Sequence, residues 1–166
     1  MKRYSRSYYV ALAEKQFEES EIQSISDMDK EKFHSVMTWV KQWMRHSKKN
    51  FLKMSSYEIK HIVEEMLGFY ITEVQFKQIM AIRGFFPINP SQENWYFKIC
   101  EYPFFYIYME YGYGHKLKGW PDRNEQNKTP TEFEEIIDMM EVFNMDAEKI
   151  IGLCKAIDKD ADGETE

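Results

Sequence analysis

The carboxyl-terminal residues hold the spacing that comes closest to a known metal-binding loop. Four residues match the first, third, fifth and sixth positions of a calcium-binding EF-hand loop: Asp158, Asp160, Asp162 and Gly163. Such a loop also needs a glutamate at its twelfth position, which falls beyond the last residue, Glu166. We therefore expect no tight calcium site, and we expect residues 158–166 to form a disordered acidic tail.

The histidines and cysteines show neither metal-ligand nor catalytic spacing. The residues concerned are His34, His46, His61, His115, Cys100 and Cys154. The chain also has no nucleophile-elbow, metalloprotease, P-loop or dinucleotide-binding motif. We therefore expect no metal, no cofactor and no enzymatic activity. Two cysteines that stand far apart are typical of reduced thiols, which favours a cytoplasmic protein.

Basic residues between 41 and 60 introduce the alternative of nucleic-acid binding. This stretch holds six basic residues and one acid, whereas residues 131–166 hold twelve acids and three lysines. Such asymmetry is typical of interaction surfaces, although a run of charge can also be only a solvated face. If a nucleic acid is bound, we expect the contacts to come from Lys48, Lys49, Lys53, Lys77 and Gln78.

Tyrosines cluster between residues 96 and 113, where the sequence alternates with a period of two. Within 104–111, this alternation places Tyr106, Tyr108 and Glu110 on one face. Tyrosine gives rigid contact area with a polar tip and is enriched at protein interfaces. We therefore predict a partner-binding surface that consists of Tyr106, Tyr108, Glu110, Tyr111 and Tyr113. The alternative is a core with tyrosines at its rim.

Two helices close together in the sequence stand before this aromatic segment. Capping-box pairs mark both helix starts: Ser55 with Glu58, and Thr72 with Gln75. Gly68 and Gly84 stand where the two helices end, because glycine readily adopts the left-handed conformation found there. The spacing thus predicts a helix-turn-helix-like pair over 55–84.

Regular patterns on both sides of this pair complete the predicted architecture. Apolar residues recur every three or four positions within 29–47, which predicts an amphipathic helix. The alternating segment 94–113 predicts an aromatic β-hairpin, and residues 129–157 predict acidic C-terminal helices that begin at a threonine–proline cap. We therefore expect a single α+β domain over 1–157, mainly helical, in which the helix-turn-helix-like pair is followed by a small antiparallel β-sheet.

The bulk composition limits the class of protein. The 166 residues carry a net charge of −6, and 43% of them are hydrophobic, so the chain can bury a core. No apolar run is long enough to span a membrane, and the first residues lack the apolar core of a signal peptide. Because a DNA duplex would be repelled by most of an acidic surface, the charge favours a protein, or a basic nucleic-acid channel, as the partner. The oligomeric state stays open.

Residues 55–87 resemble a module of small accessory proteins from bacteriophages and mobile elements. The module has the form S-Y-x-L-K-H-x-x-E, then G-x-Y-[IV]-[ST]-x-x-x-F, then a helix that ends in G-F. The matching residues are Ser56, Tyr57, Lys60, His61, Glu64, Gly68, Tyr70, Ile71, Thr72 and Phe76. Ile59 replaces the usual leucine, and Ile79 and Met80 replace smaller residues. The resemblance implies an accessory phage factor, such as an anti-CRISPR inhibitor of host defence, or a small regulator.

These observations lead to one functional hypothesis and one alternative. We expect a non-enzymatic binding protein of phage or mobile-element type whose partner is a host or phage protein. It would inhibit a host nucleic-acid-binding defence complex, such as a CRISPR effector, by direct protein–protein contact. The alternative is a winged helix-turn-helix DNA-binding regulator.

Overall fold

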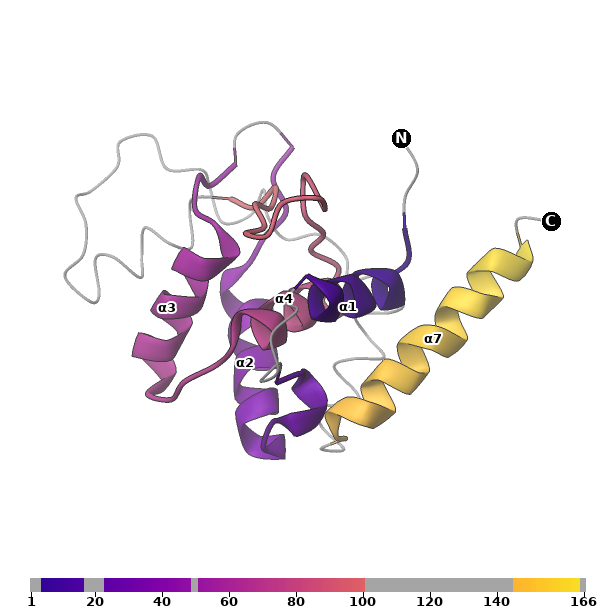
Figure 1. Ribbon diagram of the computed structural model, residues 1–166, viewed down its shortest axis with the longest axis horizontal. Coiled ribbons are helices and arrows are strands. Elements are labelled where there is room, and N and C mark those ends of the chain that lie inside the picture. The colour runs from indigo at the N-terminus through magenta and orange to yellow at the C-terminus, as the bar shows by residue number, and fades with distance from the viewer. Residues whose placement is uncertain (1–3, 17–22, 49–50, 101–144, 165–166) are drawn as a thin grey trace.

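The computed structural model describes residues 4–16, 23–48, 51–100 and 145–164 (Figure 1). These residues are mainly helical. In chain order, the helices are α1 (Arg6–Lys15), the short 3-10 helix η1 (Ile25–Asp27), α2 (Lys30–Trp43), α3 (Ser56–Leu67), α4 (Glu73–Ile82) and α7 (Ala147–Glu164). Within this described part of the chain, no helix combines the length and the apolar character that a bilayer crossing requires.

Helix α4 lies at the centre of the packing. α1, α2, α3 and η1 all pack against it, and every residue of α4 is buried. Its apolar side chains, such as Phe76 and Met80, share one core cluster with Val10 of α1 and Met37 of α2. Each fully buried side chain of this kind contributes about 2 kcal/mol to folding. α7 packs on α1 and η1, at one side of the molecule (Figure 1).

The predicted starts of α3 and α4 are confirmed. The Ser55 hydroxyl accepts a hydrogen bond from the Glu58 N–H at 3.4 Å, and the Glu58 carboxylate accepts one from the Ser55 N–H at 2.8 Å. Thr72 and Gln75 repeat this exchange at 3.0 and 2.9 Å. Gly68 ends α3 with a φ of 79°, in the left-handed region that favours glycine. These caps satisfy backbone groups that helix ends otherwise leave without partners.

The predicted antiparallel sheet is wrong for the described part of the chain, because no strand occurs there. Residues 95–100 form only isolated antiparallel bridges with other segments. Their burial does alternate as the period-two pattern indicated, since Trp95, Phe97 and Ile99 are buried and the residues between them are exposed. The remainder of the predicted hairpin 94–113, beyond residue 100, lies outside the described residues.

Residues 95–100 bond to loops rather than to a second strand. The N–H of Leu52 donates to the carbonyl of Ile99 at 2.9 Å, and the N–H of Ile88 donates to the carbonyl of Tyr96 at 2.8 Å. Because the pairings stay single, no ladder of strands develops. The alternating pattern therefore reflects burial against a helical core, and it cannot show which backbone supplies the hydrogen bonds.

The carboxyl-terminal predictions differ in part from the structure. α7 continues to Glu164, so residues 158–164, which we expected in a disordered tail, are helical. No proline interrupts α7, and extending an existing helix adds one hydrogen bond per residue without requiring apolar burial. The part of the predicted helices within 129–144 lies outside the described residues.

Candidate functional site

A buried polar network joins the first turns of α3 and α4. The Ser56 hydroxyl donates a hydrogen bond to the Glu73 carboxylate, and the backbone N–H of Trp95 donates to the Ser56 hydroxyl at 3.0 Å. One turn further along α4, the Lys77 ammonium donates to the carbonyl of Glu93. The same ammonium lies 4.9 Å from the centre of the Trp95 ring, in a cation–π contact.

Burial shifts the ionisation of both charged groups in this network. It raises the pKa of Glu73, although the Ser56 hydroxyl and the Lys77 ammonium oppose the shift. It lowers the pKa of Lys77 from 10.5 to about 8, although the nearby carboxylates oppose the shift. Perturbed pairs of this kind also occur in active sites. Here both side chains are buried and bonded to protein groups, so the network sets the geometry of α3 and α4.

A second ionic cluster lies between α3 and the turn that follows it. Lys60 is buried, and its ammonium pairs with the Glu64 carboxylate at 2.5 Å. The rings of Tyr57 and Tyr70 both contact this ammonium, with centroids 5.7 and 4.7 Å from the nitrogen. Glu64 also accepts a hydrogen bond from the N–H of Ile71 at 3.3 Å, which ties the turn to α3. One buried lysine therefore holds two tyrosine rings from different segments.

Tyr57 belongs to an exposed stripe along α3, and Tyr70 joins it from the turn that follows the helix. The residues on the helix repeat at intervals of three and four positions, so they lie along one side. We call the exposed set the α3 stripe: Tyr57, Glu58, His61, Glu65 and Tyr70. Tyr57 is 50% exposed and Tyr70 is 70% exposed. The His61 ring packs edge-on against the Tyr57 ring, with ring centroids 4.4 Å apart. Its Nδ1 lies 3.0 Å from the Glu64 carboxylate, so contacts within α3 restrict the side chains of the stripe.

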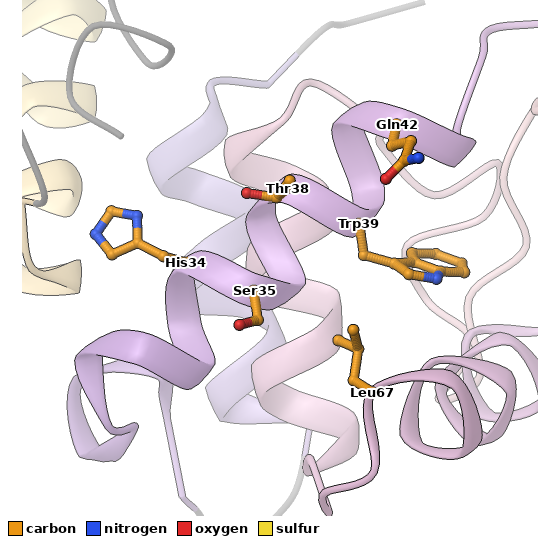
Figure 2. Close-up of a pocket in the computed structure, with 6 residues that line it drawn as sticks. All are labelled: His34, Ser35, Thr38, Trp39, Gln42 and Leu67. Atoms are coloured by element: carbon orange, nitrogen blue, oxygen red, sulfur yellow. The ribbon is translucent and has the colours of Figure 1, made fainter. Parts of the chain in front are cut away.

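An open groove of about 390 Å³ lies beside α2 (Figure 2). It is lined by His34, Ser35, Thr38, Trp39, Gln42 and Leu67. Figure 2 shows that His34 points away from the Trp39 ring, and its Nε2 contacts the carbonyl of Met145. The Ser35 hydroxyl donates to the carbonyl of Glu31 at 2.8 Å rather than to His34. The groove therefore presents contact surface rather than a paired nucleophile and base.

The predicted nucleic-acid-binding residues do not form one surface. Lys48 and Lys53 are exposed, but Lys77 and Gln78 are both 0% exposed. Lys49 lies outside the described residues. The placement of Lys77 and Gln78 contradicts the prediction for these two residues, because a nucleic acid cannot reach them in this fold.

Gln78 is buried because it links α4 to two other elements. Its amide nitrogen donates to the carbonyl of Val10 and to the carboxylate of Glu14, both at 3.0 Å. Its oxygen accepts a hydrogen bond from the N–H of Ile25 at 2.9 Å. The polar side of a helix faces solvent only where no other element packs against it, and here α1 and η1 pack against the polar side of α4. The spacing of residues within α4 cannot show that these elements bury it.

The residues of the predicted partner-binding surface lie outside the described part of the chain: Tyr106, Tyr108, Glu110, Tyr111 and Tyr113. The α3 stripe was not among the predicted sites, although its signal is present in the sequence. The spacings S-Y-x-x-K-H-x-x-E and G-x-Y hold the residues that meet around the ammonium of Lys60. That Tyr70 returns to this point depends on the left-handed turn at Gly68.

No protein family, curated protein or solved structure matched this chain. The chemistry of the described residues is therefore the basis for a functional proposal. The described residues present exposed aromatic rings, neighbouring carboxylates and an open groove, and all three are suited to contact with another molecule.

Proposed function

We propose that this protein is a non-enzymatic binding protein of phage or mobile-element type. It acts in the cytoplasm of a bacterial host cell and inhibits a host nucleic-acid-binding defence complex by direct protein–protein contact. The observation that carries the proposal is the α3 stripe, in which two exposed tyrosines are held around one buried lysine.

Tyrosines that are ordered before binding are efficient contact residues. Association orders side chains at an entropic cost, and Lys60 already restricts Tyr57 and Tyr70 in the free protein. Truncating an aromatic anchor at the centre of an interface typically costs about 2 kcal/mol or more of binding free energy. Tyr4 and Tyr8 are also exposed, but they stack on each other with ring centroids 4.1 Å apart, so they serve as a comparison.

Reading of a DNA duplex by α4 is not part of this proposal. Lys77 and Gln78, which were expected to contact DNA, are buried. The exposed surface of α3 carries the carboxylates of Glu58 and Glu65, which repel a phosphate backbone.

Capture from a bacterial host lysate tests the proposal. The tagged protein is incubated with lysate, with and without nuclease, and the retained proteins are identified by mass spectrometry. We expect a nuclease-resistant partner that binds nucleic acid, and we expect its binding to a labelled nucleic acid to fall when this protein is added. The double variant Tyr57→Ala/Tyr70→Ala should lose this partner, whereas Tyr4→Ala/Tyr8→Ala should retain it.

Thermal melting shows whether the variants remain folded. Each double variant loses ring contacts worth about 1–2 kcal/mol, the Lys60 cation–π contacts in one and the Tyr4–Tyr8 stack in the other, so both should melt below the wild type by a similar amount and stay folded. If Tyr57→Ala/Tyr70→Ala captures the partner as well as the wild type does, the α3 stripe is not the contact surface. If the captured partner keeps its full nucleic-acid binding, this protein does not inhibit it.

A further inference from the structure

The exposed charges of α3 are all of one sign. Glu58 and Glu65 are exposed, whereas Lys60, the one lysine of this fully described helix, is buried and paired with Glu64. The α3 stripe therefore presents two carboxylates beside its aromatic rings, and no exposed lysine or arginine stands among them along α3. A cationic partner therefore meets attraction along α3, whereas beside Tyr70 the exposed Lys32, whose ammonium lies 5.5 Å from the centre of the Phe69 ring, adds one positive charge.

The aromatic rings of the stripe already bind a cation within the protein. The Lys60 ammonium lies 5.7 Å from the Tyr57 centroid and 4.7 Å from the Tyr70 centroid, within the distance of about 6 Å at which a ring attracts a cation. Tyr70 remains 70% exposed, so most of its surface stays accessible to a second cation. Lys60 is thus bound by aromatic rings and a carboxylate, and an incoming cation would meet the same two kinds of group.

We propose that the α3 stripe recognises an arginine-rich surface of the partner protein, at the place where that partner binds nucleic acid. This inference rests on the proposed function. A guanidinium group is planar, so it stacks on an aromatic ring and donates paired hydrogen bonds to a carboxylate. A lysine ammonium is a compact and strongly hydrated charge that matches this pair of groups less well. Because arginines also contact phosphate backbones, a bound α3 stripe would exclude the nucleic acid.

Short oligo-arginine and oligo-lysine peptides of equal length and charge are the probes for this inference. Fluorescence anisotropy of the labelled peptides gives their dissociation constants for the full-length protein. We expect the arginine peptide to bind more tightly than the lysine peptide. Tyr57→Ala/Tyr70→Ala should weaken arginine-peptide binding roughly tenfold, and Glu58→Gln/Glu65→Gln should weaken it roughly fivefold.

A matched variant separates recognition from general attraction to an acidic protein. Glu31→Gln/Glu148→Gln removes two exposed carboxylates from α2 and α7, as many as the stripe variant removes from α3. It should change arginine-peptide affinity by about twofold or less, as expected for screened surface charges on other helices. The inference is overturned if the two peptides bind equally well, or if neither stripe variant loses more affinity than this control.

The capture experiment distinguishes this inference from the proposed function. If Tyr57→Ala/Tyr70→Ala loses the partner while Glu58→Gln/Glu65→Gln keeps it, and arginine is not preferred, the inference fails and the proposed function stands. If Tyr57→Ala/Tyr70→Ala keeps the partner, the proposed function itself fails, whatever the peptides show.

Discussion

The hydroxyl of Ser56 donates a hydrogen bond to the buried carboxylate of Glu73, and this bond ties the first turn of α3 to the first turn of α4. Each of these residues directly follows the capping residue of its helix, Ser55 or Thr72. The capping residues satisfy their own helices, so the next side chains are available to bridge them. The mutual placement of the two helices therefore depends on a contact between their first residues.

We predict that Ser56→Ala destabilises the protein by roughly 3 kcal/mol. The change removes the donor to Glu73, whose other carboxylate oxygen is buried without a hydrogen bond, and it removes the acceptor for the Trp95 N–H. Each buried polar group left without a partner costs about 1–3 kcal/mol. Urea unfolding measures the loss, with Ser26→Ala at an exposed position of η1 as the control. Equal unfolding midpoints for the two variants would show that the bridge contributes nothing.

We predict that Lys77→Met changes how stability depends on pH. Burial lowers the pKa of Lys77 to about 8 from 10.5, so between these values the unfolded chain binds more protons than the folded protein does. Wild-type stability therefore gains from this group as pH rises through that window, by up to about 1 kcal/mol per pH unit, and the variant lacks this gain. Urea midpoints of both proteins at about pH 8 and about pH 10.5, the two ends of this window, measure the difference.

An exposed lysine provides the control for this pH dependence. Lys48→Met removes the same charge from the surface and should leave the pH dependence of the wild type in place. If the stabilities of the wild type and Lys77→Met run parallel between pH 8 and pH 10.5, the Lys77 ammonium is as well solvated in the folded protein as in the unfolded chain.

Two glycines with left-handed backbones should respond differently to alanine. At Gly68, with a φ of 79°, a Cβ meets nothing within 4 Å, so Gly68→Ala should cost about 1 kcal/mol of backbone strain alone. At Gly84, with a φ of 86°, a Cβ lies 3.1 Å from the Arg6 guanidinium, which donates to the Ile82 carbonyl. Gly84→Ala should therefore cost more, about 2 kcal/mol by urea unfolding. In an Arg6→Ala background, the cost of Gly84→Ala should fall to that of Gly68→Ala, and an unchanged difference would contradict this explanation.

The tyrosines at 106 and 108 provide a separate prediction, since they lie outside the described residues. If they form an interface, Tyr106→Ala/Tyr108→Ala should abolish capture of the partner while shifting the melting temperature little. Ile107 is an apolar residue that stands between these two tyrosines in the sequence, and Ile107→Ala should destabilise by about 2–5 kcal/mol if it deletes a core side chain. Melting of the tyrosine variant at the temperature of Ile107→Ala would instead place these tyrosines in the core.

Local sequence signals predicted the helix starts correctly, but they could not show which side chains are buried by segments distant in the sequence. The capping boxes at Ser55 and Thr72 depend on residues three positions apart, so the sequence contains all the information they need. The burial of Gln78 depends on Ile25 and Val10, which are 53 and 68 residues away. The alternating pattern from Trp95 to Ile99 predicted correctly which side chains are buried. The same pattern could not show which segments form backbone bridges with these residues.

Two acceptors of the Lys77 ammonium come from opposite directions along the chain, since Gln16 precedes it by 61 residues and Glu93 follows it by 16. During synthesis α4 and Gln16 are complete before Glu93 has been added, so burying the ammonium at that stage leaves the hydrogen bond to Glu93 unmade, at a cost of about 1–3 kcal/mol. A nascent chain that ends between α4 and Glu93 therefore favours a state in which Lys77 stays in water. We expect α4 to dock in a single late step on the ribosome, after the chain on both sides of it has emerged, rather than helix by helix in the order of synthesis.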